Sequence, residues 1–154
     1  MAKSWIVVAD SARARIFEFD PRAREFDELT GLVHEQSRSR GSDLSADKDG
    51  RSFDSRGSGR HGLERHTSPH EHEAELFARL IVERLAAGQK TGAYQKFHLA
   101  APPAFLGILR KCLDQSLQDC LDKVLNKNIV TESPEEICEH FFGSYRYKRA
   151  GVDD

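Results

Sequence analysis

Three short apolar runs open the chain, each bounded by polar turn residues. Residues 5–9 (Trp-Ile-Val-Val-Ala) form a β-branched run that is typical of a strand buried on both faces. A partly alternating run over 14–19 predicts a second strand, which Asp20-Pro21 ends, and residues 26–35 predict a third. Because the connections between the three are short, an antiparallel meander is the simplest arrangement.

Helical spacing dominates the chain after residue 67. Ser68, Pro69 and Glu71 form the pattern of a capping box at the start of a helix. We expect Gly88 to end this helix. Its predicted core face consists of Ala74, Phe77, Leu80, Ile81 and Leu85.

The last third of the chain predicts alternating strand and helix. Residues 97–101 predict a strand, and 104–113 predict a helix with Phe105 and Leu109 in the core. Residues 117–130 fit a helix, but 121–130 could instead hold a last strand, so both alternatives stay open. Ser133-Pro134-Glu135-Glu136 opens a final helix with Ile137 and Phe141 on its core face. The whole pattern predicts a mixed α/β fold.

Residues 36–67 have a different composition from the rest of the chain. They contain seven Ser and five Gly, and their only large apolar residues are Leu44, Phe53 and Leu63. This segment is too polar to fold around a core of its own. We therefore expect one α/β domain over 1–144, with a long flexible polar loop inserted at 36–67 and a tail at 145–154.

Overall charge and cysteine content exclude several classes of protein. The 154 residues carry 23 Lys and Arg against 25 Asp and Glu, a net charge of −2, so no strong overall field attracts nucleic acid or an anionic membrane. No apolar run approaches the roughly 20 residues of a membrane span. The protein has three cysteines, Cys112, Cys120 and Cys138, which is an odd number, and they lack Cys-x-x-Cys spacing. This pattern argues against a disulfide framework and against a zinc ribbon. We expect a cytoplasmic protein without membrane contact, cofactor or bound metal.

Few residues carry recognisable chemistry. Asp10 follows the first strand, where a carboxylate can meet a ligand or a metal ion, although a role in capping the turn is the simpler interpretation. His61, His66, His70 and His72 match no zinc-binding spacing. The tail sequence Tyr145-Arg146-Tyr147-Lys148-Arg149 interleaves aromatic rings with cations, a combination that suits single-stranded nucleic acid, but a solvated terminus is the simpler interpretation.

Several stretches of the sequence are distinctive. They lie in 47–55 (Asp-Lys-Asp-Gly-Arg-Ser-Phe-Asp-Ser), 59–64 (Gly-Arg-His-Gly-Leu-Glu), 77–80 and 101–110. Together with the opening strands, they resemble the bacterial host attachment protein family, whose members were named as proteins required for attachment to host cells. That family is thought to be related to the central domain of archaeal and eukaryotic peptide-chain release factors. The resemblance therefore implies a ribonuclease H-like mixed sheet, and the order of the predicted strands agrees with it.

The resemblance also suggests a function for the segment 36–67. In the release factors the corresponding loop carries Gly-Gly-Gln, whereas the only Gln within 36–67 is Gln36. We therefore expect a binding module without catalytic residues. Its Arg/His/Gly loop would bind RNA such as tRNA, the ribosome, or another protein. The alternative is a hydrolase of peptidyl- or aminoacyl-tRNA-type esters. The expected binding residues are Asp10, Arg51, Arg60, His61 and Glu64.

Overall fold

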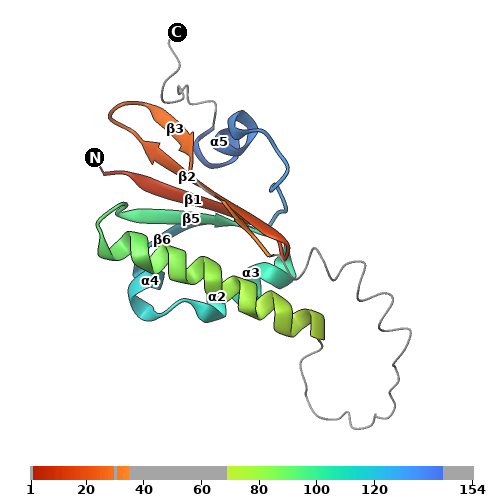
Figure 1. The fold of residues 1–154 in the computed structure, drawn as a ribbon. Coiled ribbons are helices and arrows are strands. Elements are labelled where there is room, and N and C mark those ends of the chain that lie inside the picture. The colour runs from red at the N-terminus through yellow and green to blue at the C-terminus, as the bar shows by residue number, and fades with distance from the viewer. Residues whose placement is uncertain (1, 30, 35–68, 144–154) are drawn as a thin grey trace, which may run out of the picture.

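The computed structural model describes residues 2–29, 31–34 and 69–143 (Figure 1). Within them lies one mixed sheet of six strands, in the order β3-β2-β1-β5-β6, with β4 paired to β2. β2 runs antiparallel to both β1 and β3, whereas β5 is parallel to both β1 and β6. The strands are β1 Ser4–Ala9, β2 Arg13–Asp20, β3 Glu25–Glu28, β4 Leu32–Val33, β5 Lys96–Ala100 and β6 Leu121–Leu125. The predicted mixed α/β fold with an opening meander is confirmed.

The helices cover both faces of this sheet. α2, α3 and α4 lie on one face, and the short α5 lies on the other (Figure 1). Side chains alternate along β1, so that Trp5 and Val7 join one core cluster with α2 and α3, while Ile6 and Val8 join a second cluster with α5. The helices are α2 Pro69–Lys90, α3 Pro103–Cys112, α4 Gln115–Cys120 and α5 Pro134–Phe142.

The third predicted strand is interrupted. In place of one strand over 26–35, β3 ends at Glu28 and the short β4 pairs separately with the start of β2. Between them, a Cβ on Gly31 would come within 2.8 Å of the Ala14 carbonyl oxygen. The chain therefore approaches β2 so closely at this point that only a glycine fits.

The core face of α2 is confirmed except at one position. Phe77, Ile81 and Leu85 are fully buried, but 46% of Leu80 is exposed to solvent. The prediction for Leu80 was wrong because the buried stripe follows residues 74, 77, 78, 81, 85 and 88, and Leu80 lies outside that stripe.

Gly88 does not end α2, contrary to the prediction. The helix continues to Lys90, and Gly88 is buried inside it. A Cβ at this position would lie 2.6 Å from the Trp5 ring and 2.9 Å from the Tyr94 ring. The glycine is needed because the helix packs directly against these two aromatic side chains.

The ambiguous region 117–130 contains both a helix and a strand. α4 ends at Cys120 and β6 begins at the next residue. The predicted capping box of α5 is present, because Ser133 Oγ accepts from the N–H of Glu136 while the Glu136 carboxylate accepts from the N–H of Ser133. Cys138 is buried, and Cys112 and Cys120 are half-buried free thiols. None of the helices described here is long and apolar enough to cross a membrane.

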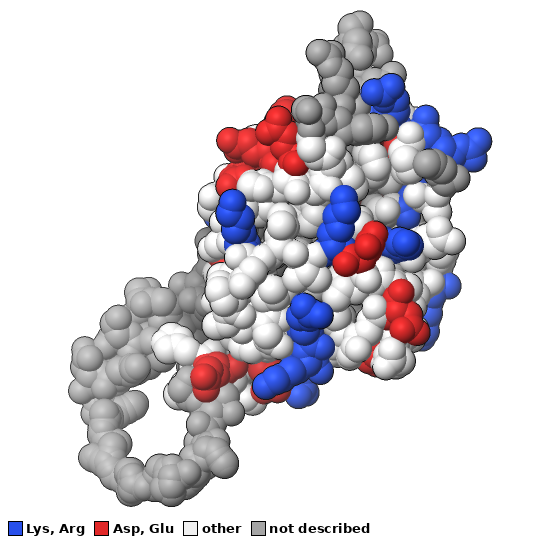
Figure 2. All heavy atoms as spheres, turned by 180° about the vertical axis from the view of Figure 1, so that it is seen from behind, with Lys and Arg blue, Asp and Glu red and all other residues white. Residues whose placement is uncertain are grey.

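Charge is unevenly distributed over the described surface. On the face turned away from Figure 1, Lys and Arg side chains gather along the edge that holds the amino end of β1 (Figure 2). The opposite edge, where β1 and β5 end, is the one from which the segment 35–68 leaves the described structure.

Candidate functional site

The carboxyl ends of β1 and β5 share one edge of the sheet because the two strands are parallel. The described residues that flank the polar segment, which is predicted to bind a partner, lie at this edge (Figure 1). Its amino end is held by His34, whose backbone N–H donates to the Ala12 carbonyl at 2.8 Å, beside the β1–β2 turn. Its carboxyl end continues into α2 at Pro69.

A side-chain contact joins the two ends. His34 Nε2 lies 3.1 Å from Glu73 Oε1, which belongs to the first turns of α2. At this distance a ring nitrogen that carries its hydrogen donates to a carboxylate oxygen. The imidazole is 7% exposed and stacks on Phe77, with ring centroids 5.1 Å apart. This contact ties the end of β4 to the start of α2.

Asp10 lies at the same edge and caps the β1–β2 turn. Its Oδ1 accepts from the backbone N–H groups of Ala12 at 2.9 Å and Arg13 at 3.0 Å. Its own N–H donates to the Arg13 carbonyl. The geometry is that of an Asx turn, as the simpler interpretation of the sequence predicted.

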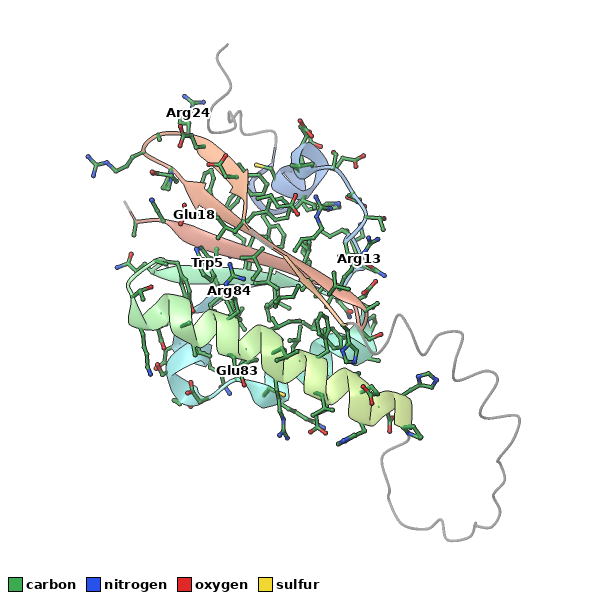
Figure 3. All side chains as sticks on the ribbon, in the orientation of Figure 1. Trp5, Arg13, Glu18, Arg24, Glu83 and Arg84 are labelled. Carbon is green, nitrogen blue, oxygen red and sulfur yellow. The ribbon has the colours of Figure 1, made fainter. Side chains whose placement is uncertain are left out.

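The other predicted binding residues lie outside the described residues. Arg51, Arg60, His61 and Glu64 all belong to 35–68, so their role stays a prediction. The structure does place one exposed cation beside the two ends of the segment. Arg13 opens β2 at this edge, and Figure 3 shows it at the opposite end of the sheet from Arg24.

The sequence patterns did not single out His34 and Glu73. The two residues are 39 positions apart, and no short motif links them. The available signals were a His directly before the polar segment and a Glu on the first turns of the following helix. Only the packing of α2 across β1 and β2 brings the two side chains together.

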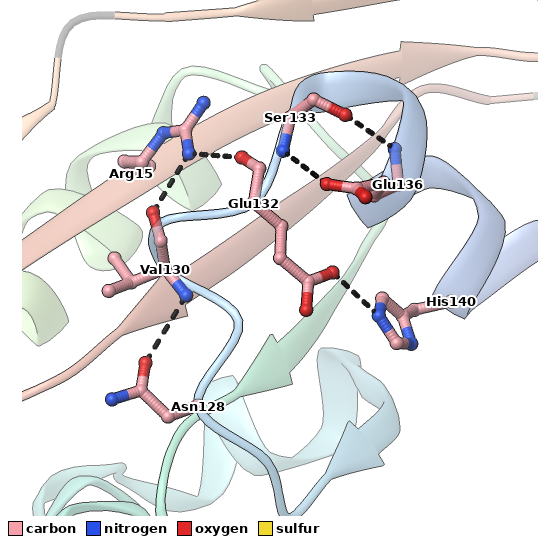
Figure 4. A network of polar contacts seen from close by, with 7 residues as sticks. All are labelled: Arg15, Asn128, Val130, Glu132, Ser133, Glu136 and His140. Carbon is pink, nitrogen blue, oxygen red and sulfur yellow. Dashed lines mark hydrogen bonds and ion pairs between the residues drawn. The ribbon is translucent and has the colours of Figure 1, made fainter.

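A second polar cluster lies on the α5 side of the sheet. Arg15 Nη1 donates to the carbonyls of Val130 and Glu132, at 2.8 and 2.7 Å, and thereby holds the segment before α5 (Figure 4). Glu132 Oε1 lies 2.8 Å from His140 Nε2. A cavity of about 540 Å³ beside them is lined by Glu132, Glu136, Glu139, His140 and Gly143.

The described residues contain no set of three or more His, Cys, Asp or Glu side chains placed to hold a metal ion. One histidine is strongly perturbed but structural. Burial lowers the pKa of His98 from 6.5 to about 4, and its Nδ1 accepts the backbone N–H of Lys123 at 3.1 Å. This bond lies at the irregularity in the pairing of β5 with β6.

Comparison with known proteins identifies the family of this chain. The family model described as "Protein required for attachment to host cells" matches residues 5–141, so the chain belongs to that family. Among solved structures, an archaeal translation termination factor, aRF1, is similar, with 15% sequence identity and a TM-score of 0.48. That match covers 92% of this chain but 36% of the factor, so the chain spans about a third of its length. No curated protein matched the chain.

Proposed function

We propose that this protein is a binding module without catalytic residues, in which one edge of a rigid sheet presents the segment 36–67 to RNA. The observation that carries the proposal is the contact between His34 and Glu73. It joins the two described flanks of the segment at the sheet edge, one at the end of β4 and the other at the start of α2. Binding segments held by a rigid scaffold are a common arrangement in proteins.

The composition of the segment supports RNA as the partner. Arg51, Arg60 and His61 are its proposed contacts with phosphate, and Gly50, Gly59 and Gly62 stand beside them in the sequence. Guanidinium groups bind phosphate oxygens through paired hydrogen bonds, and glycine lets a backbone approach a ligand closely. In the proposed site Asp10 holds the turn beside the segment, and Glu64 is a further proposed binding residue of the segment.

We extend the proposal to the fold class, as a single domain of the ribonuclease H-like type. Its support is the strand order β3-β2-β1-β5-β6, with an antiparallel first half and a parallel second half. The Asp10 carboxylate, which a nuclease of that fold would use for a metal ion, accepts two backbone N–H groups here. This arrangement favours a binding role over nuclease chemistry.

The test is the salt dependence of binding to tRNA and to ribosomes. Each lost phosphate contact should lower the slope of log affinity against log salt by roughly 0.7–0.9. Arg51→Ala with Arg60→Ala should therefore weaken binding and reduce the slope, while the circular dichroism spectrum stays unchanged. A matched control, Arg79→Ala with Lys111→Ala, removes two exposed cations from α2 and α3.

His61 adds a dependence on pH. A histidine near its usual pKa of about 6.5 should strengthen anion binding as the pH falls from about 7.5 to 6, and His61→Gln should remove that gain. A purified protein that binds neither tRNA nor ribosomes at low salt would contradict the proposal and make the segment a docking site for another protein. Release of an amino acid or peptide from charged tRNA would instead favour the hydrolase alternative.

A further inference from the structure

The amino-terminal edge of the sheet gathers exposed cations from four separate segments. We name this surface the basic edge, and its members are Lys3, Arg22, Arg24, Lys90 and Lys96. They come from the start of β1, the turn between β2 and β3, the end of α2 and the start of β5. The basic edge is opposite the edge from which the segment 35–68 departs (Figures 1 and 3).

Backbone pairing holds these cations in place. Ser4 pairs with Lys96 in the parallel register of β1 and β5, and the Gln95 N–H donates to the Lys3 carbonyl at 3.0 Å. The end of α2 is fastened to the same edge, because the Tyr94 hydroxyl donates to the Leu85 carbonyl. A hollow of about 290 Å³ lies beside Lys3 and is lined by Ala2, Lys3, Gly92, Ala93, Tyr94 and Gln95.

The acidic side chains at this edge neutralise it only in part. Glu18 Oε1 lies 3.7 Å from Lys3 Nζ, but half of the lysine side chain is exposed, so solvent screens this pair. Asp20 caps the turn, because its Oδ1 accepts the N–H groups of Arg22 at 3.0 Å and Ala23 at 3.3 Å, and its negative charge remains beside Arg22. Glu25, which pairs with Asp20 at the start of β3, adds a third carboxylate, so the edge has five cations against three acids. Figure 2 shows the resulting concentration of Lys and Arg along this side of the molecule.

We infer that the basic edge is a second contact surface for nucleic acid, which takes the phosphate backbone of a single-stranded RNA. Cations on several elements follow the line of the edge, and this arrangement suits an extended polyanion better than a small anion. A membrane surface fits less well. The large apolar side chains exposed among the described residues are Val33, Leu76 and Leu80, and none of them belongs to the basic edge.

The test compares two triple variants with equal charge change. Lys3→Gln, Arg22→Gln and Lys96→Gln alter the basic edge, whereas Arg79→Gln, Arg110→Gln and Lys111→Gln alter exposed positions on α2 and α3. The probe is a fluorescent oligouridylate of about 12 nucleotides, titrated by anisotropy at several salt concentrations. The edge variant should lower the slope of log affinity against log salt by roughly 2, and the control should keep the slope of the parent protein.

Arg24 provides a variant in which binding and stability should change in opposite directions. Its φ of 60° lies in the left-handed region, which an L side chain adopts at a cost and glycine adopts freely. Arg24→Gly should therefore raise the thermal midpoint and still weaken binding to the oligouridylate. Binding equal to that of the parent protein, in this variant and in the edge triple variant, overturns the inference.

Two further outcomes also test whether the basic edge binds RNA. If the edge triple variant loses affinity for phosphatidylserine vesicles but not for the oligouridylate, the surface binds membranes and the inference is wrong. The inference is independent of the proposed function, because Arg51→Ala with Arg60→Ala leaves the basic edge intact. If only the edge triple variant loses binding, the result supports the inference and contradicts the role of the segment. If only Arg51→Ala with Arg60→Ala loses binding, the result supports the role of the segment and contradicts the inference.

Discussion

His34 Nε2 and Glu73 Oε1 lie 3.1 Å apart and join the end of β4 to the start of α2, across 39 positions of the sequence. The imidazole is buried and stacked on Phe77, so this contact is shielded from water. His34→Ala should lower the free energy of unfolding by about 1–3 kcal/mol, because it leaves a polar partner in a half-buried site.

A double-mutant cycle with His34→Ala and Glu73→Ala, measured by urea denaturation, isolates the pair from the other contacts of each residue. The coupling should be about 0.5–3 kcal/mol, the range for residues in direct contact. Strictly additive single effects would show that the two flanks of the segment are not joined in solution.

Gly88 and Gly107 form a matched pair of helical glycines with opposite expectations. At Gly88 a Cβ would lie 2.6 Å from the Trp5 ring, whereas at Gly107 nothing lies within 4 Å. Gly88→Ala should destabilise the protein by about 1–3 kcal/mol through overpacking. Gly107→Ala should stabilise it by about 0.5–1 kcal/mol through helix propensity. Chemical denaturation measures both, and stabilisation by Gly88→Ala would mean that α2 does not pack on Trp5 as described.

His98 should make stability depend on pH. The folded protein resists protonation of this buried ring, with a pKa of about 4, while the unfolded chain binds the proton near the usual value of 6.5. Between these values the unfolded state holds more protons, so the free energy of unfolding should fall as the pH drops from about 6.5 to 4, by roughly 3 kcal/mol. The loss should be absent above about pH 7.

His98→Asn is the control for this effect. Its side-chain oxygen can accept the Lys123 N–H in place of Nδ1, and it does not titrate. The difference in stability between the parent protein and this variant should change across the same pH window. A parallel pH dependence for the two proteins would assign the acid sensitivity to other groups.

Neighbouring positions on α2 test the helix register. Ile81 is fully buried and Leu80 is 46% exposed. Ile81→Ala should cost about 2–5 kcal/mol, the usual range for a truncation in the core. Leu80→Ala should cost less than about 0.5 kcal/mol, as exposed substitutions do. Equal costs at the two positions in urea denaturation would contradict the described burial of this helix.

Local patterns predicted most of the fold. The run at 5–9, the alternation at 14–19 and the capping box at Ser133 are signals carried by neighbouring residues, and each element was confirmed. The errors arose where a distant residue decided the outcome. Gly88 is required inside α2 by its close packing against Trp5, so it does not mark a helix end. The third strand is split where Gly31 approaches Ala14. No local pattern contains that information.

The candidate site was less predictable than the fold. Asp10 could be placed because turn chemistry is local, and its role as a cap follows from the two N–H groups beside it. The contact between His34 and Glu73 depends on how α2 crosses the sheet, so it required the tertiary structure. The basic edge also required the tertiary structure. Its five cations are scattered along the sequence, and the sheet register brings them to one side.

The central claim is that the segment 36–67 binds while the sheet and its helices serve as a scaffold. Replacing residues 40–60 by a short Gly/Ser linker tests it most directly, with tRNA affinity and the thermal midpoint measured on the same protein. We predict a midpoint within a few degrees of the parent protein, because loop length changes closure entropy only slowly, together with a large loss of affinity. Retained affinity with an unchanged midpoint would contradict the claim, and a collapse in stability would show that the segment belongs to the core.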